Sequence, residues 1–196
     1  VFRILSEEEK VSVLHRIKEI SEEWLKSKQG HEKGFSLGFF SEEYICNFKI
    51  AVVERNGEIQ AFANFWTSAD KNEVSPDMMR YMDNAPSDTM EFLFLSLILW
   101  AKEDGYAYFD LGMAPLSGLR GGPHGSLWGR TAEMLYEYGN VFYNFQGLRE
   151  YKEKYKPILE SRYVAFPHEL SLPAVLAAAA VLISKGPRGI RPVVVK

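Results

Sequence analysis

Two apolar, β-rich segments joined by an Asn-Gly turn constrain the fold of this chain more than any other feature of its sequence. The segments are residues 48–54 and 59–67, and Asn56-Gly57 lies in the short connection between them. Asparagine and glycine adopt positive φ angles at little cost, and both central positions of a tight hairpin turn require such angles. The sequence therefore predicts an antiparallel hairpin, which commits this part of the chain to a β-sheet.

Helical periodicity on both sides of the hairpin extends this prediction. Residues 6–28 repeat apolar side chains mainly at helical spacing, and Ser6 with Glu9 forms a capping box. Residues 87–104 predict a second helix, which Gly105 closes. The other predicted elements are a short strand or turn at a sheet edge over 76–81, strands over 106–113, 141–145 and 161–166, and helices over 127–138, 147–155 and 170–184.

This order of elements predicts an α/β or α+β domain with a central mixed sheet flanked by helices. It is compatible with the superfold of the Gcn5-related N-acetyltransferases. We expect one domain over residues 1–184, because a chain of 196 residues with 46% hydrophobic residues can bury a substantial core. Residues 185–196 hold basic residues, prolines and glycines without periodicity, and we expect them to form a flexible basic tail.

Charge and cysteine content exclude several classes of function. The 23 basic and 26 acidic residues give a net charge of −3, which excludes the strongly basic surface of proteins that grip long stretches of nucleic acid. The single cysteine, Cys46, excludes an internal disulfide and favours a cytoplasmic compartment. The histidines lie in no recognisable motif, and no metal is expected. No stretch reaches the roughly 18 to 20 apolar residues that span a bilayer, and the initial valine suggests that an N-terminal portion precedes this sequence.

A conventional acyl-CoA-dependent member of the superfold carries a glycine-rich turn after its central strand, with the pattern Arg/Gln-x-x-Gly-x-Gly/Ala, whose amides cradle the pyrophosphate. Residues 68–75 follow the predicted strand over 59–67 and contain no glycine. The sequence therefore favours a donor other than acyl-CoA.

Residues 109–119, Phe-Asp-Leu-Gly-Met-Ala-Pro-Leu-Ser-Gly-Leu, carry the most specific family signal. Residues 62–66, 75–81 and 143–157, followed by Arg162-Tyr163, add to it. Together these segments resemble the lysylphosphatidylglycerol synthase family, also called multiple peptide resistance factors. The resemblance implies an integral membrane domain followed by a synthase domain of two consecutive acyltransferase-like folds, and this sequence resembles the second fold.

The resemblance also implies a reaction. A hydroxyl of phosphatidylglycerol attacks the carbonyl of an aminoacyl-tRNA ester, commonly lysyl, and tRNA is released. No cofactor is implied, because the donor is already activated and the protein must mainly position both substrates and stabilise the oxyanion. The implied product lowers the negative charge of the membrane and gives resistance to cationic antimicrobial peptides. The implied partners are the acceptor end of aminoacyl-tRNA, phosphatidylglycerol and the membrane surface at its cytoplasmic face, and the N-terminal acyltransferase-like and membrane domains of the same polypeptide.

Four residues are candidates for catalysis: Asp77, Arg80, Asp110 and Ser117. Asp77 is a candidate ligand for the ammonium groups of a lysyl moiety and Arg80 for a phosphate, and the alternative is a surface salt bridge. Asp110 lies in an apolar strand, where a buried carboxylate needs a partner; it either orients the substrate amine or a hydroxyl, or anchors the turn that follows. Ser117 either supplies a hydroxyl or amide to an oxyanion or is simply a small residue in a turn.

Five further residues are candidates for substrate binding. Glu91 is either an amine ligand or a carboxylate that stabilises the positive N-terminus of its helix. Arg149, Tyr151, Lys152 and Lys154 lie in one short helical segment, which suits phosphates and stacked bases, unless it is a solvated charged face. The last helix is apolar over residues 174–183; core packing is preferred over a place in the membrane interface.

Two other functions remain open on the sequence. The first keeps the superfold but makes a peptide or another amine the acceptor of the aminoacyl group. The second is a noncatalytic module that docks tRNA or the membrane while another domain performs the chemistry.

Overall fold

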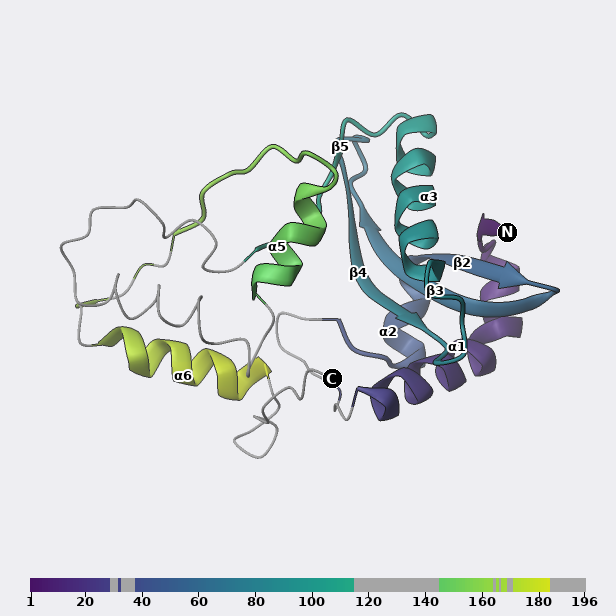
Figure 1. The fold of residues 1–196 in the computed structure, drawn as a ribbon, viewed down its shortest axis with the longest axis horizontal. Coiled ribbons are helices and arrows are strands. Elements are labelled where there is room, and N and C mark those ends of the chain that lie inside the picture. Colours follow the sequence, from purple (N-terminus) through teal and green to yellow (C-terminus); the bar gives the residue numbers. More distant parts are fainter. Residues whose placement is uncertain are drawn as a thin grey trace. The chain divides into compact units, whose positions relative to one another are not determined.

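A five-stranded sheet lies in the first of the two units into which the chain divides, Val1–Asp110 and Leu111–Lys196 (Figure 1). The computed structural model describes residues 1–28, 32, 38–114, 145–163, 165, 167–168 and 171–183. The strands are β1 (Phe2–Ile4), β2 (Lys49–Arg55), β3 (Glu58–Thr67), β4 (Glu73–Tyr81) and β5 (Tyr108–Phe109).

The sheet is mixed. Strands β1 to β4 pair antiparallel in chain order, and β5 pairs parallel with β4. A parallel pair requires a crossover connection, which α3 (Thr89–Glu103) provides. The structure therefore confirms the predicted α/β fold with a central mixed sheet.

Helices cover both faces of the sheet, because its strands alternate their side chains between two hydrophobic clusters. The first cluster packs α1 (Glu7–Ser27) and α2 (Glu42–Cys46) against one face, and the second packs α3 against the other (Figure 1). Neighbouring residues of β2 show the alternation, since Ile50 belongs to the first cluster and Ala51 to the second.

The structure confirms the predicted hairpin turn, the glycine after α3 and the capping box of α1. Asn56 and Gly57 have φ angles of 56° and 82° in the β2–β3 turn. Gly105 follows α3 with a φ of 84°. Ser6 and Glu9 form the capping box at the start of α1.

Several strand predictions are wrong in extent. The predicted strand over 106–113 is reduced to the two residues of β5, and β1 and α2 were not predicted at all. Residues 76–81 belong to β4, a longer strand that also includes Glu73–Ser75; among the described residues β5 pairs with β4 only at Glu73 and Val74. Sequence-based prediction misses such short elements because they contain too few residues for a periodic signal.

The connection that leads into α3 also differs from the one that the sequence suggested. Residues 68–72 only link β3 to β4, with Lys71 at a φ of 58°. The strand-to-helix connection is residues 82–88, which contain no glycine. Its Asp83 backbone N–H donates to Oε1 of Glu23 at 2.9 Å, so a carboxylate already occupies this amide.

Two helices are described in the second unit, α5 (Phe145–Glu153) and α6 (Leu172–Ile183). They confirm the predicted helices over 147–155 and 170–184 to within the usual uncertainty of helix ends. The predicted strand over 161–166 is wrong for the residues described there, which lie in no strand and are exposed. Three predicted segments lie outside the described residues: the helix over 127–138, residues 141–144 of a strand, and the tail over 185–196.

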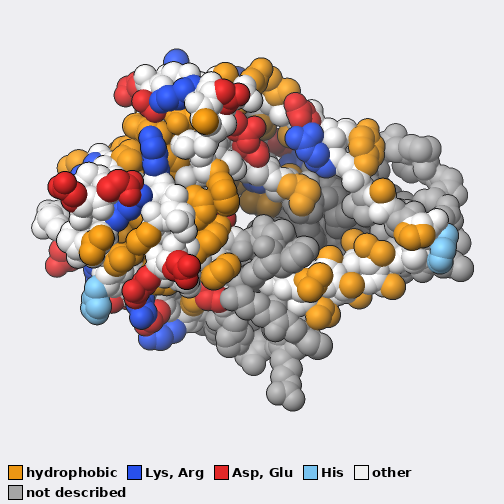
Figure 2. All heavy atoms as spheres, turned by 180° about the vertical axis from the view of Figure 1, so that it is seen from behind, with side chains coloured by type: hydrophobic (Ala, Val, Ile, Leu, Met, Phe, Trp, Pro, Cys, Tyr) orange, Lys and Arg blue, Asp and Glu red, His pale blue; other side chains and the backbone are white. Residues whose placement is uncertain are grey.

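Hydrophobic side chains are exposed along α6 (Figure 2). Val175, Leu176 and Leu182 are exposed to 38%, 50% and 53%, so the preferred core packing of this helix is not observed for these side chains. Within the described parts of the chain, no helix combines the length and the apolar character needed to cross a bilayer.

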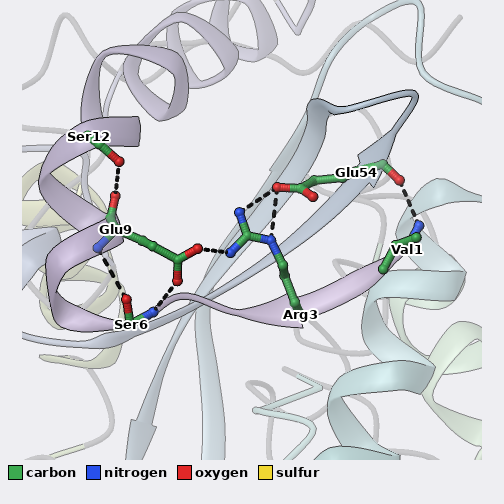
Figure 3. Close-up of polar contacts among 6 residues, drawn as sticks. All are labelled: Val1, Arg3, Ser6, Glu9, Ser12 and Glu54. Carbon is green, nitrogen blue, oxygen red and sulfur yellow. Dashed lines mark hydrogen bonds and ion pairs between the residues drawn. The ribbon is translucent and has the colours of Figure 1, made fainter.

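A charged network fastens the N-terminal strand to the start of α1 (Figure 3). Arg3 pairs with Glu9 of α1, and its Nη2 donates to Oε1 of Glu54 in β2 at 2.7 Å. Hydrogen bonds from Ser6, the larger cause, and from Arg3 lower the pKa of Glu9. The same carboxylate therefore serves the capping box and the attachment of β1.

Replacing Ser6 should measure how much the N-cap side chain contributes to stability. We expect Ser6→Ala to lower the free energy of unfolding by about 1 kcal/mol, because the Glu9 backbone N–H loses its acceptor. Urea-induced unfolding checks this value. Ser12→Ala is the control, since Ser12 lies within α1 and its hydroxyl donates to Glu9 O in the same helix. It should change stability by less than about 0.5 kcal/mol.

Candidate functional site

A β-bulge in β4 positions a cluster of polar side chains in the first unit. Ala63 pairs with Met79 and Phe65 pairs with Pro76, so β4 carries one extra residue opposite Asn64. The buried Asn64 side chain spans the bulge: its Oδ1 accepts from the Met78 backbone N–H at 3.0 Å. Its Nδ2 donates to the Asp77 carboxylate at 2.8 Å. Bulges of this kind redirect a side chain out of the regular alternation of a strand.

The bulge brings the side chains of Asp77 and Arg80 to the same face of the sheet. Residues three apart in a regular strand point to opposite faces. Here Asp77 contacts Tyr44 of α2, and Arg80 contacts Ser21 of α1. Both helices cover the same face.

Two donors hold the Asp77 carboxylate. The Tyr44 hydroxyl and the Asn64 amide each lie 2.8 Å from Oδ2. Within the described parts of the chain, no hydrogen bond to the other oxygen, Oδ1, is observed. Both oxygens would lie 2.3 Å from a Cβ built on Gly38, so only glycine lets the backbone approach the carboxylate this closely. The half-buried Asp77 is thus oriented from three sides, and its Oδ1 accepts no hydrogen bond from the described residues.

Tyr44 remains a hydrogen-bond donor over a wide pH range. Burial, and secondly the hydrogen bond to the Asp77 carboxylate, raise the pKa of its phenol to about 12. Both causes disfavour the phenolate.

Arg80 is occupied by protein groups rather than open to a substrate phosphate. Its guanidinium is buried, and its Nη1 and Nη2 donate to the two oxygens of Glu32 at 2.6 and 2.9 Å. It also donates to Ser21 Oγ and lies over the Trp24 ring, 5.2 Å from its centroid. The predicted alternative of a surface salt bridge with Asp77 is not observed either.

The hydrogen bonds to the Asp77 carboxylate come from Tyr44 and Asn64 and not from the other predicted residues of the first unit. Asp110 follows β5, where its backbone N–H donates to Val74 O at 2.8 Å and its side chain is exposed. The expected place of Asp110 inside a strand is therefore wrong, because β5 ends at Phe109. Glu91 is exposed and lies in the first turn of α3. Ser117 lies outside the described residues.

The four substrate-binding candidates of the second unit do share α5 and the turn after it. Arg149 pairs with Glu153 at 2.6 Å, and Lys152 Nζ donates to Met113 O at 2.8 Å. Lys154 lies over the Tyr151 ring, 5.2 Å from its centroid. In the described residues, no cluster of His, Cys, Asp and Glu side chains is suited to a metal ion.

Sequence reasoning missed most of the groups that surround Asp77. Asn64 is the only polar residue in the run Phe62-Ala63-Asn64-Phe65-Trp66, and that exception was a usable signal, because a buried amide needs partners. Tyr44 and Gly38 carry no such signal, since their role depends on a contact between distant segments.

Comparison with known proteins now identifies the family. Residues 2–166 match the family model described as phosphatidylglycerol lysyltransferase, C-terminal. The chain belongs to this family.

Curated relatives support the assignment. The chain is 42% identical over 174 residues to a phosphatidylglycerol lysyltransferase of Bacillus subtilis, and 33% identical over 172 residues to one of Staphylococcus aureus. These matches cover 88% and 87% of the chain but 20% of each relative. The chain therefore spans about a fifth of the length of these relatives.

Solved structures agree. The C-terminal domain of a lysylphosphatidylglycerol synthetase from Agrobacterium fabrum has a TM-score of 0.81 and 37% identity, covering 97% of this chain and 57% of that one. The L-PGS structure from Bacillus licheniformis has a TM-score of 0.76 and 38% identity, covering 94% and 56%. The predicted family is thus confirmed.

Removing the Tyr44 hydroxyl should change how stability depends on alkaline pH. Because the pKa is raised on folding, the stability from this phenol is complete below pH 10 and is lost as the pH rises through about 12. We expect Tyr44→Phe to be less stable than the wild type near neutral pH but to lose less stability between pH 10 and 12, as measured by urea unfolding. Tyr163→Phe, at an exposed position, should follow the wild type. A parallel Tyr44→Phe profile would contradict the assigned hydrogen bond.

Proposed function

We propose that this chain is the C-terminal part of an enzyme that transfers an aminoacyl group, lysyl in the simplest case, from aminoacyl-tRNA to phosphatidylglycerol. Membership of the phosphatidylglycerol lysyltransferase C-terminal family supports this proposal. The single structural observation that carries it is the Asp77 carboxylate, fixed by Tyr44 and Asn64 through one oxygen.

Such a carboxylate suits the ammonium groups of a lysyl ester. Charge-assisted hydrogen bonds to an ionised carboxylate are stronger than neutral ones, and a pre-oriented acceptor loses little entropy on binding. Asp77 would hold the aminoacyl moiety by an ammonium group and so place the ester carbonyl for attack. The interaction makes Asp77 a specificity determinant for a cationic aminoacyl group.

The transfer exchanges one ester for another. The glycerol hydroxyl of the lipid forms a new bond to the carbonyl carbon, the bond to the tRNA ribose oxygen breaks, and the hydroxyl proton ends on that ribose oxygen. Positioning of two bulky substrates supplies much of the rate enhancement in such a reaction. The product carries added positive charge, so the reaction would lower the negative charge of the membrane and protect against cationic antimicrobial peptides.

The proposed partners follow from the two substrates. The basic and aromatic side chains of α5 suit the phosphates and bases of the tRNA acceptor end or the lipid headgroup. In the face seen in Figure 2, acidic and basic side chains are interspersed, which favours a local contact with RNA over an extended one. The lipid acceptor implies work at the cytoplasmic face of the cell membrane, beside preceding domains of the same polypeptide.

The proposal is tested by Asp77→Asn in the complete protein. We expect kcat/KM for lysyl transfer to fall by about 10- to 100-fold, since a charge-assisted hydrogen bond contributes roughly 1.5–3 kcal/mol. Transfer of labelled lysine from lysyl-tRNA into phosphatidylglycerol vesicles measures it. The control is Asp83→Asn, which removes an exposed carboxylate and should leave transfer unchanged.

Two outcomes count against the proposal. Label transfer to a peptide acceptor rather than to phosphatidylglycerol would assign a different substrate class. Unchanged turnover in Asp77→Asn, with weaker binding of vesicles or tRNA, would make this part of the protein a docking module.

A further inference from the structure

Three consecutive residues, Gly38 to Phe40, each contact a part of the Asp77 site or of its support. We call these residues the strap. The Gly38 backbone lies against the Asp77 carboxylate, where a Cβ would come within 2.3 Å. The Phe39 ring stacks on the Tyr44 ring, with centroids 5.0 Å apart and planes 18° apart. The Phe40 backbone N–H donates to Glu32 Oε1 at 3.2 Å.

Glu32 connects the strap to the body of the fold. The Oε1 atom that receives the Phe40 N–H also receives Arg80 Nη1, and Oε2 receives Arg80 Nη2. Arg80 is in turn fixed by Ser21 and Trp24 of α1. A guanidinium with two parallel bonds to one carboxylate has little freedom to rotate, so the position of Glu32 is defined in two directions.

We propose that Glu32 and Arg80 are positioning residues that form a clamp on the strap and thereby fix Tyr44 and the Asp77 carboxylate for substrate binding. This inference rests on the proposed role of Asp77 in holding the aminoacyl group. The clamp acts at a distance: Arg80 holds Glu32, Glu32 holds Phe40, and the strap holds the Tyr44 ring and borders the carboxylate.

Stability alone is a weak reason for this arrangement. Arg80 is buried and Glu32 is partly buried, so the pair gives up much of the hydration of its charges, and well-packed apolar residues often stabilise a fold as well. The pair instead fixes the orientation of the Glu32 carboxylate, because two hydrogen bonds from the guanidinium and one from the Phe40 backbone N–H converge on it. A clamp that sets geometry therefore explains the use of charge here better than a contribution to stability does.

Two sets of changes in the complete protein test the clamp. Glu32→Gln keeps an acceptor for Phe40 but removes the charge that holds Arg80. If this single variant fails to fold, the double variant Glu32→Met with Arg80→Met keeps the test possible. It removes both charges, so that no buried charge is left unpaired. Glu160→Gln is the matched control, because Glu160 pairs with Arg162 where both side chains are exposed.

The readouts are hydrogen exchange of the strap amides and separate KM values for lysyl-tRNA and phosphatidylglycerol. We expect both clamp variants to exchange the Phe39 and Phe40 amides faster and to raise KM for lysyl-tRNA about tenfold, the scale of one charge-assisted hydrogen bond. KM for phosphatidylglycerol should not change. A merely structural role would instead lower kcat through a smaller folded fraction, with both KM values unchanged.

The outcomes separate this inference from the proposed function. Wild-type exchange in both clamp variants, or wild-type KM for lysyl-tRNA in an active protein, would overturn the clamp. If the wild type transferred no lysine to phosphatidylglycerol, the proposed function would fail, while faster strap exchange in the clamp variants would still support the clamp.

Discussion

The side chain of Asn64 is the interaction on which the geometry of this site depends. A β-bulge leaves one backbone amide of β4 without a ladder partner, and Asn64 supplies the missing acceptor to Met78. An unsatisfied buried amide would cost about 1–3 kcal/mol. Because the same side chain donates to Asp77, one residue both satisfies the backbone amide at the bulge and orients the carboxylate.

The bulge also explains why Asp77 and Arg80 act together although they do not pair. A regular strand would have placed one of them toward α3. With the extra residue, both point toward α1 and α2, where Arg80 meets Glu32 and Asp77 meets Tyr44. Arg80 is therefore bound by protein groups and supports the site, whereas Asp77 is the side chain that the proposed function assigns to the aminoacyl group.

Local chemistry decided which parts of this structure the sequence could predict. The Asn56-Gly57 turn and the Ser6 capping box rest on neighbouring residues, and both are confirmed. The family also follows from short ordered motifs, as the match over residues 2–166 confirms. The strand expected around Asp110 ends one residue earlier, at Phe109, because periodicity does not fix the end of a strand. Glu32 was missed because its partner lies 48 positions away. Tertiary contacts between segments distant in sequence define the site, and periodicity carries no information on them.

The connection before α3 bears on the kind of donor that the proposed function requires. Residues 80–85 read Arg-Tyr-Met-Asp-Asn-Ala, which follows the pattern Arg-x-x-Gly-x-Ala except that Asp83 replaces the glycine. The amide of Asp83 is taken by Glu23, and that of Ala85 by Met82 O. Amides that already bind carboxylate and carbonyl oxygens offer no cradle to a pyrophosphate, and the added carboxylates would repel one. The occupied amides of this turn therefore support the proposed aminoacyl ester donor over a donor that carries a pyrophosphate.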